Sequence, residues 1–409
     1  MNWRLINSDV IEGLRQLPDA SVHCVVTSPP YLWQRDYGVK GQIGLEPYAE
    51  EYVLKLISVF AEVRRVLRPD GTLWVNIGDT YANDTKWGGK SGHKNADSAA
   101  GGYQGQRKKR RTGLPPKSLM MIPARFAIAM QAAGWILRSE IIWHNPTRRP
   151  ESVEDRPSNN YEKVYLFTQR SHYFYDAVNV KQPASPKTLT VNTNPRKGDG
   201  NGSAGERLSA YMEANGRYHP ETANLRAVWS IPSEPNPADH YAAFPSALPT
   251  VCIQAGTSER GCCATCGAPW LRIVEKVKGQ PASVKGSSST KGKTMRAVND
   301  LSPVGQGERT MRTVTKGWKP GCKCAGGEPV ACVVLDTFSG TGTTGEAALY
   351  LGRRYIGIEL NPKDCLAAER RLREAERQAY GDLFLPFNNL RHTPRNGGLE
   401  AETPTLFDF

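Results

Sequence analysis

One stretch of the sequence, ACVVLDTFSGTGTTGEAALYLGRRYIGIELNP, constrains the fold more than any other part. An apolar run ends in Asp336, and Gly340, Gly342 and Gly345 follow in a G-x-G-x-x-G pattern. Strand, glycine loop, helix and strand in this order predict a βαβ unit of a parallel sheet, in which a ligand approaches the backbone at a helix N-terminus. Close packing without a ligand would also use such glycines, so the pattern needs support from other residues.

The N-terminal part of the sequence also alternates between strands and helices. We expect strands over 3–7, 22–27, 72–77, 136–144 and 163–169, with helices over 10–17, 48–67 and 123–133. The helix over 48–67 should stop at the sequence RPDG. Together with the C-terminal βαβ unit and a helix over 362–379, this order predicts an α/β fold with a mostly parallel sheet and helices on both faces.

Net charge and the first residues of the sequence point to a class of partner and to a compartment. The chain has 53 Lys and Arg against 40 Asp and Glu, a net charge of +13, which favours a polyanionic partner such as nucleic acid. A merely soluble basic protein would share this balance. The sequence begins MNWRLINSDV without a charged-then-apolar leader, and no run approaches the length of a membrane span, so we expect a cytoplasmic protein with no membrane partner.

A second short motif, TSPPY, follows directly on the apolar run 22–26. Two consecutive prolines cannot continue a strand, and they hold Ser28 and Tyr31 in a rigid turn at its end. In the C-terminal unit, Glu359 closes a strand where an acidic side chain accepts hydrogen bonds from both ribose hydroxyls of a nucleoside cofactor. Glu346 stands where a phosphate-binding loop needs lysine, so a P-loop is excluded.

Together, DTFSGTGTTG, YIGIELN and TSPPY resemble the paired signature of the S-adenosylmethionine-dependent amino DNA methyltransferases. The catalytic motif precedes the cofactor loop, which is similar to the β group of that family. The resemblance implies a Rossmann-like methyltransferase sheet, into which we expect irregular target-recognition and zinc-ribbon-like segments to be inserted. It also implies double-stranded DNA as the substrate, with the target base flipped out of the duplex. A departure is Thr337, where the family usually has proline.

The resemblance also implies site residues. The catalytic tetrapeptide would be Ser28, Pro29, Pro30 and Tyr31. Asp336 would hold the methionyl amino group, Glu359 would hold the ribose, and Asp9 would lie near the adenine, although an ordinary helix N-cap explains Asp9 equally well. The remaining cofactor-binding positions would be Phe338, Gly340, Gly342, Thr343 and Asn361.

The tetrapeptide suits methylation of an exocyclic amine, whose lone pair is conjugated with the ring of the base. Ser28 Oγ and the Pro29 carbonyl can each accept one amine hydrogen and hold the nitrogen in line with the methyl group, while Tyr31 stacks on the base. Since serine at the first position is typical of cytosine-N4 enzymes in the family, we predict cytosine N4, with adenine N6 as the alternative. The Pro-Cys pair that ring methylation requires is missing, and Cys24 is expected to be a buried strand residue.

Two other clusters indicate binding sites. The basic run Arg107, Lys108, Lys109, Arg110 and Arg111 is suited to DNA phosphates, although a solvated charged loop has the same composition. Further target contacts are expected where 143–145 end a strand. C-x2-C and C-x-C turns predict a structural zinc ion held by Cys263, Cys266, Cys322 and Cys324, with Cys262 as a substitute ligand.

These motifs divide the chain. Residues 1–180 would form the catalytic half, with a long basic loop over 81–117, and 181–243 the target-recognition region. The cofactor-binding half would comprise 244–260 and 331–380, interrupted by a zinc-binding insertion over 261–330, and 381–409 would be a tail.

Two rival functions remain open from the sequence. A dehydrogenase using a dinucleotide would share the glycine loop and Glu359, and a non-catalytic zinc-containing DNA-binding module would share the charge and the cysteines. Neither explains TSPPY beside an intact cofactor loop. A homodimer and a cognate restriction endonuclease are partners that the family resemblance allows, in a bacterial cell or a phage-infected host.

Overall fold

The computed structural model describes residues 2–82, 112–183, 219–220, 222–234, 244–278, 310–324 and 327–381. The larger of two compact units comprises 1–176, 226–270 and 320–409. Its elements are β1 (Trp3–Asn7), α1 (Val10–Arg15), β2 (Val22–Thr27), α2 (Ala49–Val66), β3 (Leu67–Ile77), α3 (Ile122–Ala132), β4 (Ile136–His144), β5 (Tyr161–Thr168), β9 (Val228–Ser230), α6 (Ala247–Gly256), β12 (Val333–Asp336), α7 (Thr343–Tyr350), β13 (Arg354–Glu359) and α8 (Pro362–Gly381).

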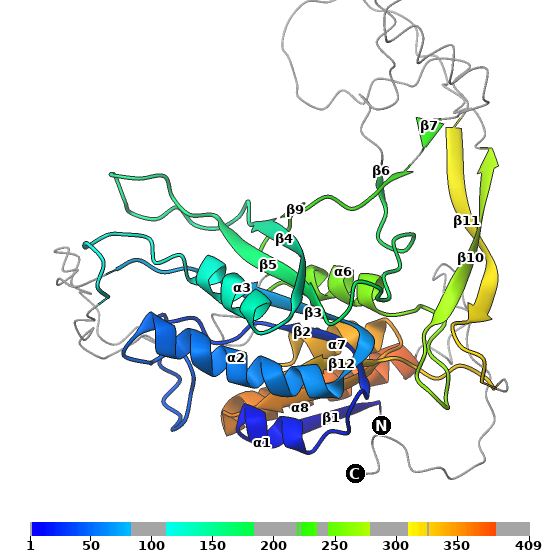
Figure 1. Ribbon diagram of the computed structural model, residues 1–409, viewed down its shortest axis with the longest axis horizontal. Helices are drawn as coiled ribbons and strands as arrows, with labels where there is room; N and C mark the ends of the chain where they lie inside the picture. The colour runs from blue at the N-terminus through cyan, green and yellow to red at the C-terminus, as the bar shows by residue number, and fades with distance from the viewer. Residues whose placement is uncertain are drawn as a thin grey trace, which may run out of the picture. The chain divides into compact units, whose positions relative to one another are not determined.

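The larger unit is built on one eight-stranded sheet with the order β1-β13-β12-β2-β3-β5-β4-β9 (Figure 1). Most neighbouring strands are parallel, and only β5 runs antiparallel to both of its neighbours, β3 and β4. Helices α1, α2 and α3 pack together in one layer and α6, α7 and α8 in another. The predicted fold, a mostly parallel α/β sheet between helices, is confirmed.

The centre of the sheet joins the two ends of the chain. β12 pairs with β2 in parallel, with Val334 opposite Cys24 and Leu335 opposite Val25. From this pair the chain proceeds outward in opposite directions, because β12 leads through α7 to β13 on one side and β2 leads through α2 to β3 on the other. Such a reversal of strand order opens a crevice at the carboxyl ends of the two central strands, where ligands of open α/β sheets bind.

The core lies mainly between the sheet and α2. Tyr52, Leu56, Val59, Phe60 and Val63 recur at three- and four-residue spacing along this helix, and all are buried. This spacing places them on one helix face, which packs on the central strands. The arrangement keeps β2 and β3 rigid where they lead into the turns at their carboxyl ends.

The smaller unit comprises 177–225 and 271–319. In it the structure describes two short paired strands, β6 (Gln182–Pro183) and β8 (Thr222–Ala223), and a three-stranded sheet with the order β10-β11-β7. The strands of that sheet are β7 (His219–Pro220), β10 (Trp270–Lys278) and β11 (Thr310–Pro320). None of the helices in the described part of the chain has the length and apolar character needed to cross a membrane.

Several elements differ from the sequence-based expectations. The sequence RPDG was expected to separate the helix from the next strand. Instead α2 ends at Val66 and β3 begins at Leu67, so RPDG lies within β3. Strand β3 absorbs RPDG as an irregularity, with a register shift against β2. Trp229, expected in an irregular stretch, lies buried in β9 with its ring 6.2 Å from that of Trp74. The reversal of β5 was also not anticipated.

Candidate active site

A cavity of about 390 Å³ lies at the carboxyl ends of β12 and β2. This volume is within the usual range for small-molecule sites. Among the predicted catalytic and cofactor-binding residues, only Gly342 is absent from its lining. The lining residues predicted from the sequence are Asp9, Ser28, Pro29, Pro30, Tyr31, Asp336, Phe338, Gly340, Thr343, Glu359 and Asn361.

One hydrogen bond joins the two sequence motifs. Thr27, the last residue of β2, donates its hydroxyl to Asp336 Oδ1 at the end of β12, with 2.7 Å between the oxygens. Asp336 Oδ2 accepts from Thr344 at 2.7 Å. Burial raises the pKa of Asp336, and these hydrogen bonds act in the opposite direction by stabilising the carboxylate. The hydroxyl of Thr337 lies 3.1 Å from that of Thr27, so threonine at this position adds a link to β2 that proline could not make.

The glycine loop owes its shape to backbone conformation and to close packing. Gly340 and Gly342 have φ values of +52° and +83°, which side-chain-bearing residues rarely adopt. Gly345 lies in α7, where a Cβ atom would come within 2.5 Å of both Leu372 and Tyr355. The first two glycines therefore form the turn, and the third lets α7 pack closely against β13 and α8.

Glu359, the last residue of the neighbouring strand β13, fixes the glycine loop. Its two carboxylate oxygens accept the backbone N–H groups of Gly340 at 2.7 Å and Asn361 at 2.8 Å. Each oxygen keeps a lone pair for a further donor. Burial raises the pKa of Glu359, and the two backbone hydrogen bonds lower it.

Two predicted residues also serve as helix caps. Asp9 is exposed, accepts the backbone N–H of Ile11 at 2.9 Å and caps α1, while lining the cavity as well. Asn361 Oδ1 accepts the N–H of Lys363 at the start of α8, and its side-chain amide donates to Asp364 at 2.8 Å. The cap explanation for Asp9 and its place in the cavity are therefore both compatible with the geometry.

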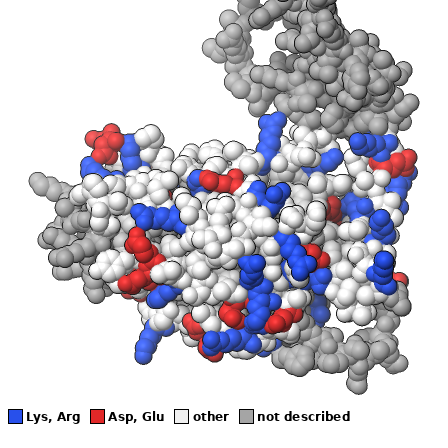
Figure 2. Space-filling view, in the orientation of Figure 1, with Lys and Arg blue, Asp and Glu red and all other residues white. Residues whose placement is uncertain are grey.

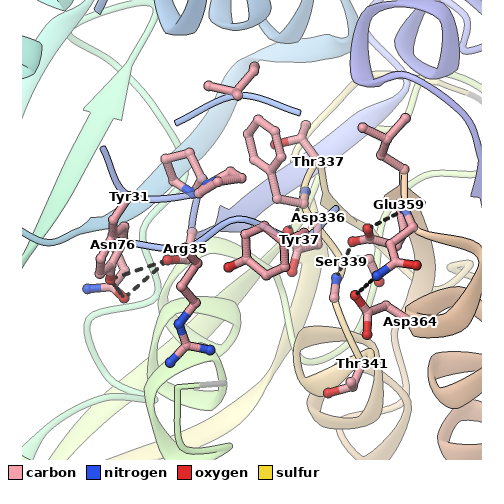
Figure 3. A pocket seen from close by; sticks show the side chains of 18 of the residues that line it. Tyr31, Arg35, Tyr37, Asn76, Asp336, Thr337, Ser339, Thr341, Glu359 and Asp364 are labelled. Atoms are coloured by element: carbon pink, nitrogen blue, oxygen red, sulfur yellow. Dashed lines mark hydrogen bonds between the residues drawn. The ribbon is translucent and has the colours of Figure 1, made fainter. Parts of the chain in front are cut away.

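The tetrapeptide Ser28-Pro29-Pro30-Tyr31, predicted to be catalytic, lies next to a polar network that sequence reasoning missed. Ser28 Oγ lies 3.4 Å from both the Tyr31 hydroxyl and Asn76 Oδ1. The Tyr31 hydroxyl is 2.9 Å from Asn76 Oδ1 (Figure 3). It also lies 2.5 Å from Glu162 Oε2. Burial and the neighbouring Glu162 carboxylate hold the pKa of Tyr31 well above its ordinary value. The tyrosine ring is thus fixed at its hydroxyl end.

Weak sequence signals could have pointed to these partners. Asn76 is a polar residue near the end of the apolar strand β3, and Glu162 is the second residue of β5, whose last five residues are buried. Glu162 also forms an ion pair with Arg148 at 3.3 Å, at the side of the cavity lined by Trp143 and Asn145. The sequence placed 143–145 near the site, and two of these three residues line it.

Tyr37 is another lining residue that the sequence did not single out. Figure 3 shows it between the labelled pair Tyr31 and Asn76 and the group that includes Asp336 and Thr337. Tyr37 belongs to the segment that directly follows the tetrapeptide, so this segment and the tetrapeptide line the same cavity.

The predicted DNA-contacting run, 107–111, lies outside the described residues. On the face shown in Figure 2, basic side chains stand next to acidic ones over α1 and α2, as in the ion pairs Arg15–Glu12 and Arg65–Glu62. Over these two helices the described residues therefore present mixed charge to solvent and not a continuous basic surface.

Cys24 is fully buried, as expected, and lies on β2 away from the cavity lining. Burial raises the pKa of its thiol to about 12, which keeps it protonated and unreactive. No geometry here suits covalent attack on a base ring by Cys24.

The four cysteines predicted to bind zinc come together. The sulfur atoms of Cys263, Cys266, Cys322 and Cys324 all lie within 4.8 Å of one another. Cys262, considered as a substitute ligand, belongs to a separate buried group with His23 and Cys332.

A family model described as DNA methylase matches residues 22–264 and 330–370, which include both the tetrapeptide and the glycine loop. The chain belongs to this DNA methylase family. The methylase is similar to Type II methyltransferase M.SmaI of Serratia marcescens, 32% identical over 371 residues that cover 90% of this chain and 91% of the relative. Type II methyltransferase M.Cfr9I of Citrobacter freundii is 32% identical over 368 residues, covering 90% and 87%.

A solved structure shares the fold of the methylase. PvuII DNA methyltransferase (cytosine-N4-specific) superimposes with a TM-score of 0.50 and 17% identity, covering 94% of this chain and 93% of that one. Family membership makes the chain a DNA methyltransferase of the N6/N4 amino type and places the two motifs in one enzyme.

Proposed function

We propose that this DNA methylase transfers a methyl group from S-adenosylmethionine to the exocyclic N4 amine of cytosine in double-stranded DNA. The observation that best supports the proposal is the 2.7 Å hydrogen bond between Thr27 and Asp336. It brings the ends of the catalytic and cofactor motifs, far apart in the chain, to one cavity at the switch point of the sheet.

The charges of the cavity support a cationic cofactor. Carboxylates outnumber guanidinium groups in its lining, where Asp9, Glu162, Asp336, Glu359 and Asp364 face Arg35 and Arg148. S-adenosylmethionine carries a sulfonium and an ammonium group, whereas a dinucleotide carries two phosphates that these carboxylates would repel. The same balance argues against a dehydrogenase.

Individual residues suit the parts of this cofactor. Glu359 has carboxylate lone pairs left for ribose hydroxyls, and Asp336 can accept the amino group while tied to Thr27. When bound, S-adenosylmethionine supplies an electrophilic methyl group. Phe338 is half-buried against the core and lines the cavity beside the glycine loop.

The tetrapeptide would prepare the amine as a nucleophile. Ser28 can donate its own proton toward Asn76 or Tyr31, which leaves its oxygen lone pairs for one amine hydrogen, and the Pro29 carbonyl accepts the other. As the new N–C bond forms, the C–S bond breaks and the sulfur keeps its electron pair. One amine proton is then released, and Glu162, which accepts the hydroxyl of Tyr31, is a carboxylate of this network that can take it up.

DNA must enter with the target base extruded, because the acceptors lie inside the cavity. Tyr31, held by Asn76 and Glu162, would present a fixed ring for stacking. We assign target recognition to residues 181–243 and phosphate contacts to 107–111. A homodimer and a cognate endonuclease belong to this proposal as well, supported by the Type II relatives only for the restriction-modification setting.

The choice of cytosine rests on Ser28 as the first residue of the tetrapeptide. Adenine N6 is the second candidate, since its amine needs the same two acceptors. The PvuII enzyme is named as cytosine-N4-specific, but its 17% identity supports the fold alone.

The test is product analysis. Plasmid DNA methylated by the purified protein is digested to nucleosides and analysed by liquid chromatography with mass detection. We expect N4-methylcytosine, and far less of it from the same incubation with Ser28→Ala. N6-methyladenine alone would overturn the base assignment, and 5-methylcytosine would overturn the mechanism as well.

A further inference from the structure

The cysteine cluster lies in the larger unit and takes no part in the cavity at the carboxyl ends of the strands. Its four sulfur atoms, mutually within 4.8 Å, are spaced as ligands of a single ion. Tetrahedral zinc with Zn–S bonds of about 2.3 Å separates its sulfur ligands by roughly 3.8 Å. We propose that Cys263, Cys266, Cys322 and Cys324 bind one structural zinc ion.

The first pair of ligands lies in a turn that the backbone already holds. The N–H of Gly267 donates to the Cys263 carbonyl at 2.9 Å, and the N–H of Cys263 donates to Ala268 at 2.8 Å. Gly267 has a φ of +68°, and a Cβ there would come within 2.5 Å of Arg68. Since this glycine allows the turn, the first two thiols converge without needing the metal to bend the chain.

The second pair returns from a distant point of the sequence. The C-x2-C turn immediately precedes β10, and the C-x-C turn immediately follows β11. Within that strand pair, Arg272 donates to Thr315 at 2.7 Å, and Lys316 forms an ion pair with Glu275 at 2.8 Å. A metal bound by both turns would therefore cross-link the two chain segments that lead into and out of the β10–β11 insertion.

Side chains from the sheet anchor the metal-binding turn. His23 Nε2 lies 2.9 Å from the Gly267 carbonyl, and Arg68 donates to the Cys266 carbonyl at 2.6 Å. Arg68 is itself fixed by two hydrogen bonds to Asp70. His23 and Arg68 lie near the amino ends of β2 and β3, so the site is at the end of these strands opposite to Ser28.

The neighbouring group of His23, Cys262 and Cys332 is not a second metal site by this geometry. His23 Nδ1 accepts the backbone N–H of Val333 at 3.0 Å, while Nε2 contacts Gly267. Both ring nitrogens are therefore engaged within the protein. Cys262 directs its thiol to the Val330 carbonyl at 3.5 Å. A complete set of four thiolates leaves no open coordination position, which makes the proposed zinc structural and not catalytic.

The adjacent cysteines Cys262 and Cys263 provide a matched pair of variants. The whole chain, purified without a metal-binding tag and kept reduced, is analysed for metals by mass spectrometry. We expect about one zinc per chain in the wild type and in Cys262→Ser, and less than about a tenth of that in Cys263→Ser and Cys322→Ser. Cys365→Ser is a second control for metal content.

Two further measurements keep the proposal testable if a variant does not fold. Cobalt substitution of the wild type should give the absorption of tetrahedral thiolate coordination, and titration with a mercurial reagent should release zinc as the thiols react. Metal-free wild type with all thiols reduced, iron in place of zinc, or equal zinc loss in Cys262→Ser and Cys263→Ser would each overturn the proposal. None of these readouts depends on methyl transfer.

Discussion

Strand β2 carries polar residues at both ends, and the two ends differ in how these residues are satisfied. Near the amino end, His23 uses both ring nitrogens within the protein, on Val333 and Gly267. Beyond the carboxyl end, the Ser28 hydroxyl lines the cavity, and its hydrogen bonds to described residues are long, at 3.4 Å each. Polar groups that are fully satisfied hold a structure together, whereas groups that retain lone pairs toward a cavity can bind a ligand.

The largest expected effect concerns the carboxyl end. Ser28→Ala should lower kcat by about 10²–10³-fold, because a fixed hydrogen-bond acceptor for the amine is lost. Affinity for S-adenosylmethionine, measured by calorimetry, should remain unchanged. Ser58→Ala, on the surface of α2, is the control. Equal losses of rate and cofactor affinity would contradict the assignment of Ser28 to the base.

Glu359→Gln should weaken binding of S-adenosylmethionine by about 1–3 kcal/mol, since it removes a charged hydrogen-bond acceptor. Glu376→Gln is a matched control, because Glu376 also accepts a backbone N–H and an indole N–H but lies outside the cavity. If Glu359→Gln and the wild type bound S-adenosylmethionine with similar affinity, Glu359 would not be the residue that binds the ribose.

The same residue predicts a pH dependence. Burial raises the pKa of Glu359 above its ordinary 4.5. The carboxylate is therefore protonated at a higher pH than an exposed glutamate, and cofactor affinity should fall as the pH decreases through this raised value. Calorimetry across acidic pH should show a smaller decrease for Glu359→Gln, and a parallel decrease would assign the titration to another group.

At the amino end, His23→Ala should lower the free energy of unfolding by about 1–3 kcal/mol, since it leaves the buried N–H of Val333 without its acceptor. The kcat of the folded protein should not change. His23→Asn, which can restore that acceptor, should recover part of the stability in urea unfolding. If kcat fell as much as in Ser28→Ala, His23 would affect catalysis as well as stability, and the two ends of β2 would not have separate roles.

The smallest effect is expected at the link between the motifs. Thr27→Val keeps the shape of the side chain but removes its hydrogen bond to Asp336, and should weaken cofactor binding by about 1 kcal/mol. Thr72→Val removes another buried hydroxyl, which bonds Trp74 in the core, and should affect stability without affecting affinity. Calorimetry on both variants tests whether the Thr27 link matters for the ligand.

Much of the local structure was predictable from the sequence. The strands over 3–7, 22–27 and 136–144 have the expected bounds, because each ends at a local turn or helix-capping signal, such as Ser8-Asp9, Pro29-Pro30 and Asn145-Pro146. The loop with Gly340 and Gly342 was also predictable from the sequence, since few residues other than glycine adopt its positive φ angles. The placement of Ser28 and Asp336 at strand ends followed from the same local patterns.

The tertiary structure decided which of these local pieces meet. Pairing of β12 with β2, the antiparallel direction of β5 and the inclusion of β9 depend on contacts between distant segments, which no local pattern encodes. For the same reason Asn76 and Glu162 became partners of Tyr31 only through strand pairing. The sequence determines which side chains can accept hydrogen bonds. Tertiary packing decides which of these acceptors are occupied within the protein and which remain available to a ligand.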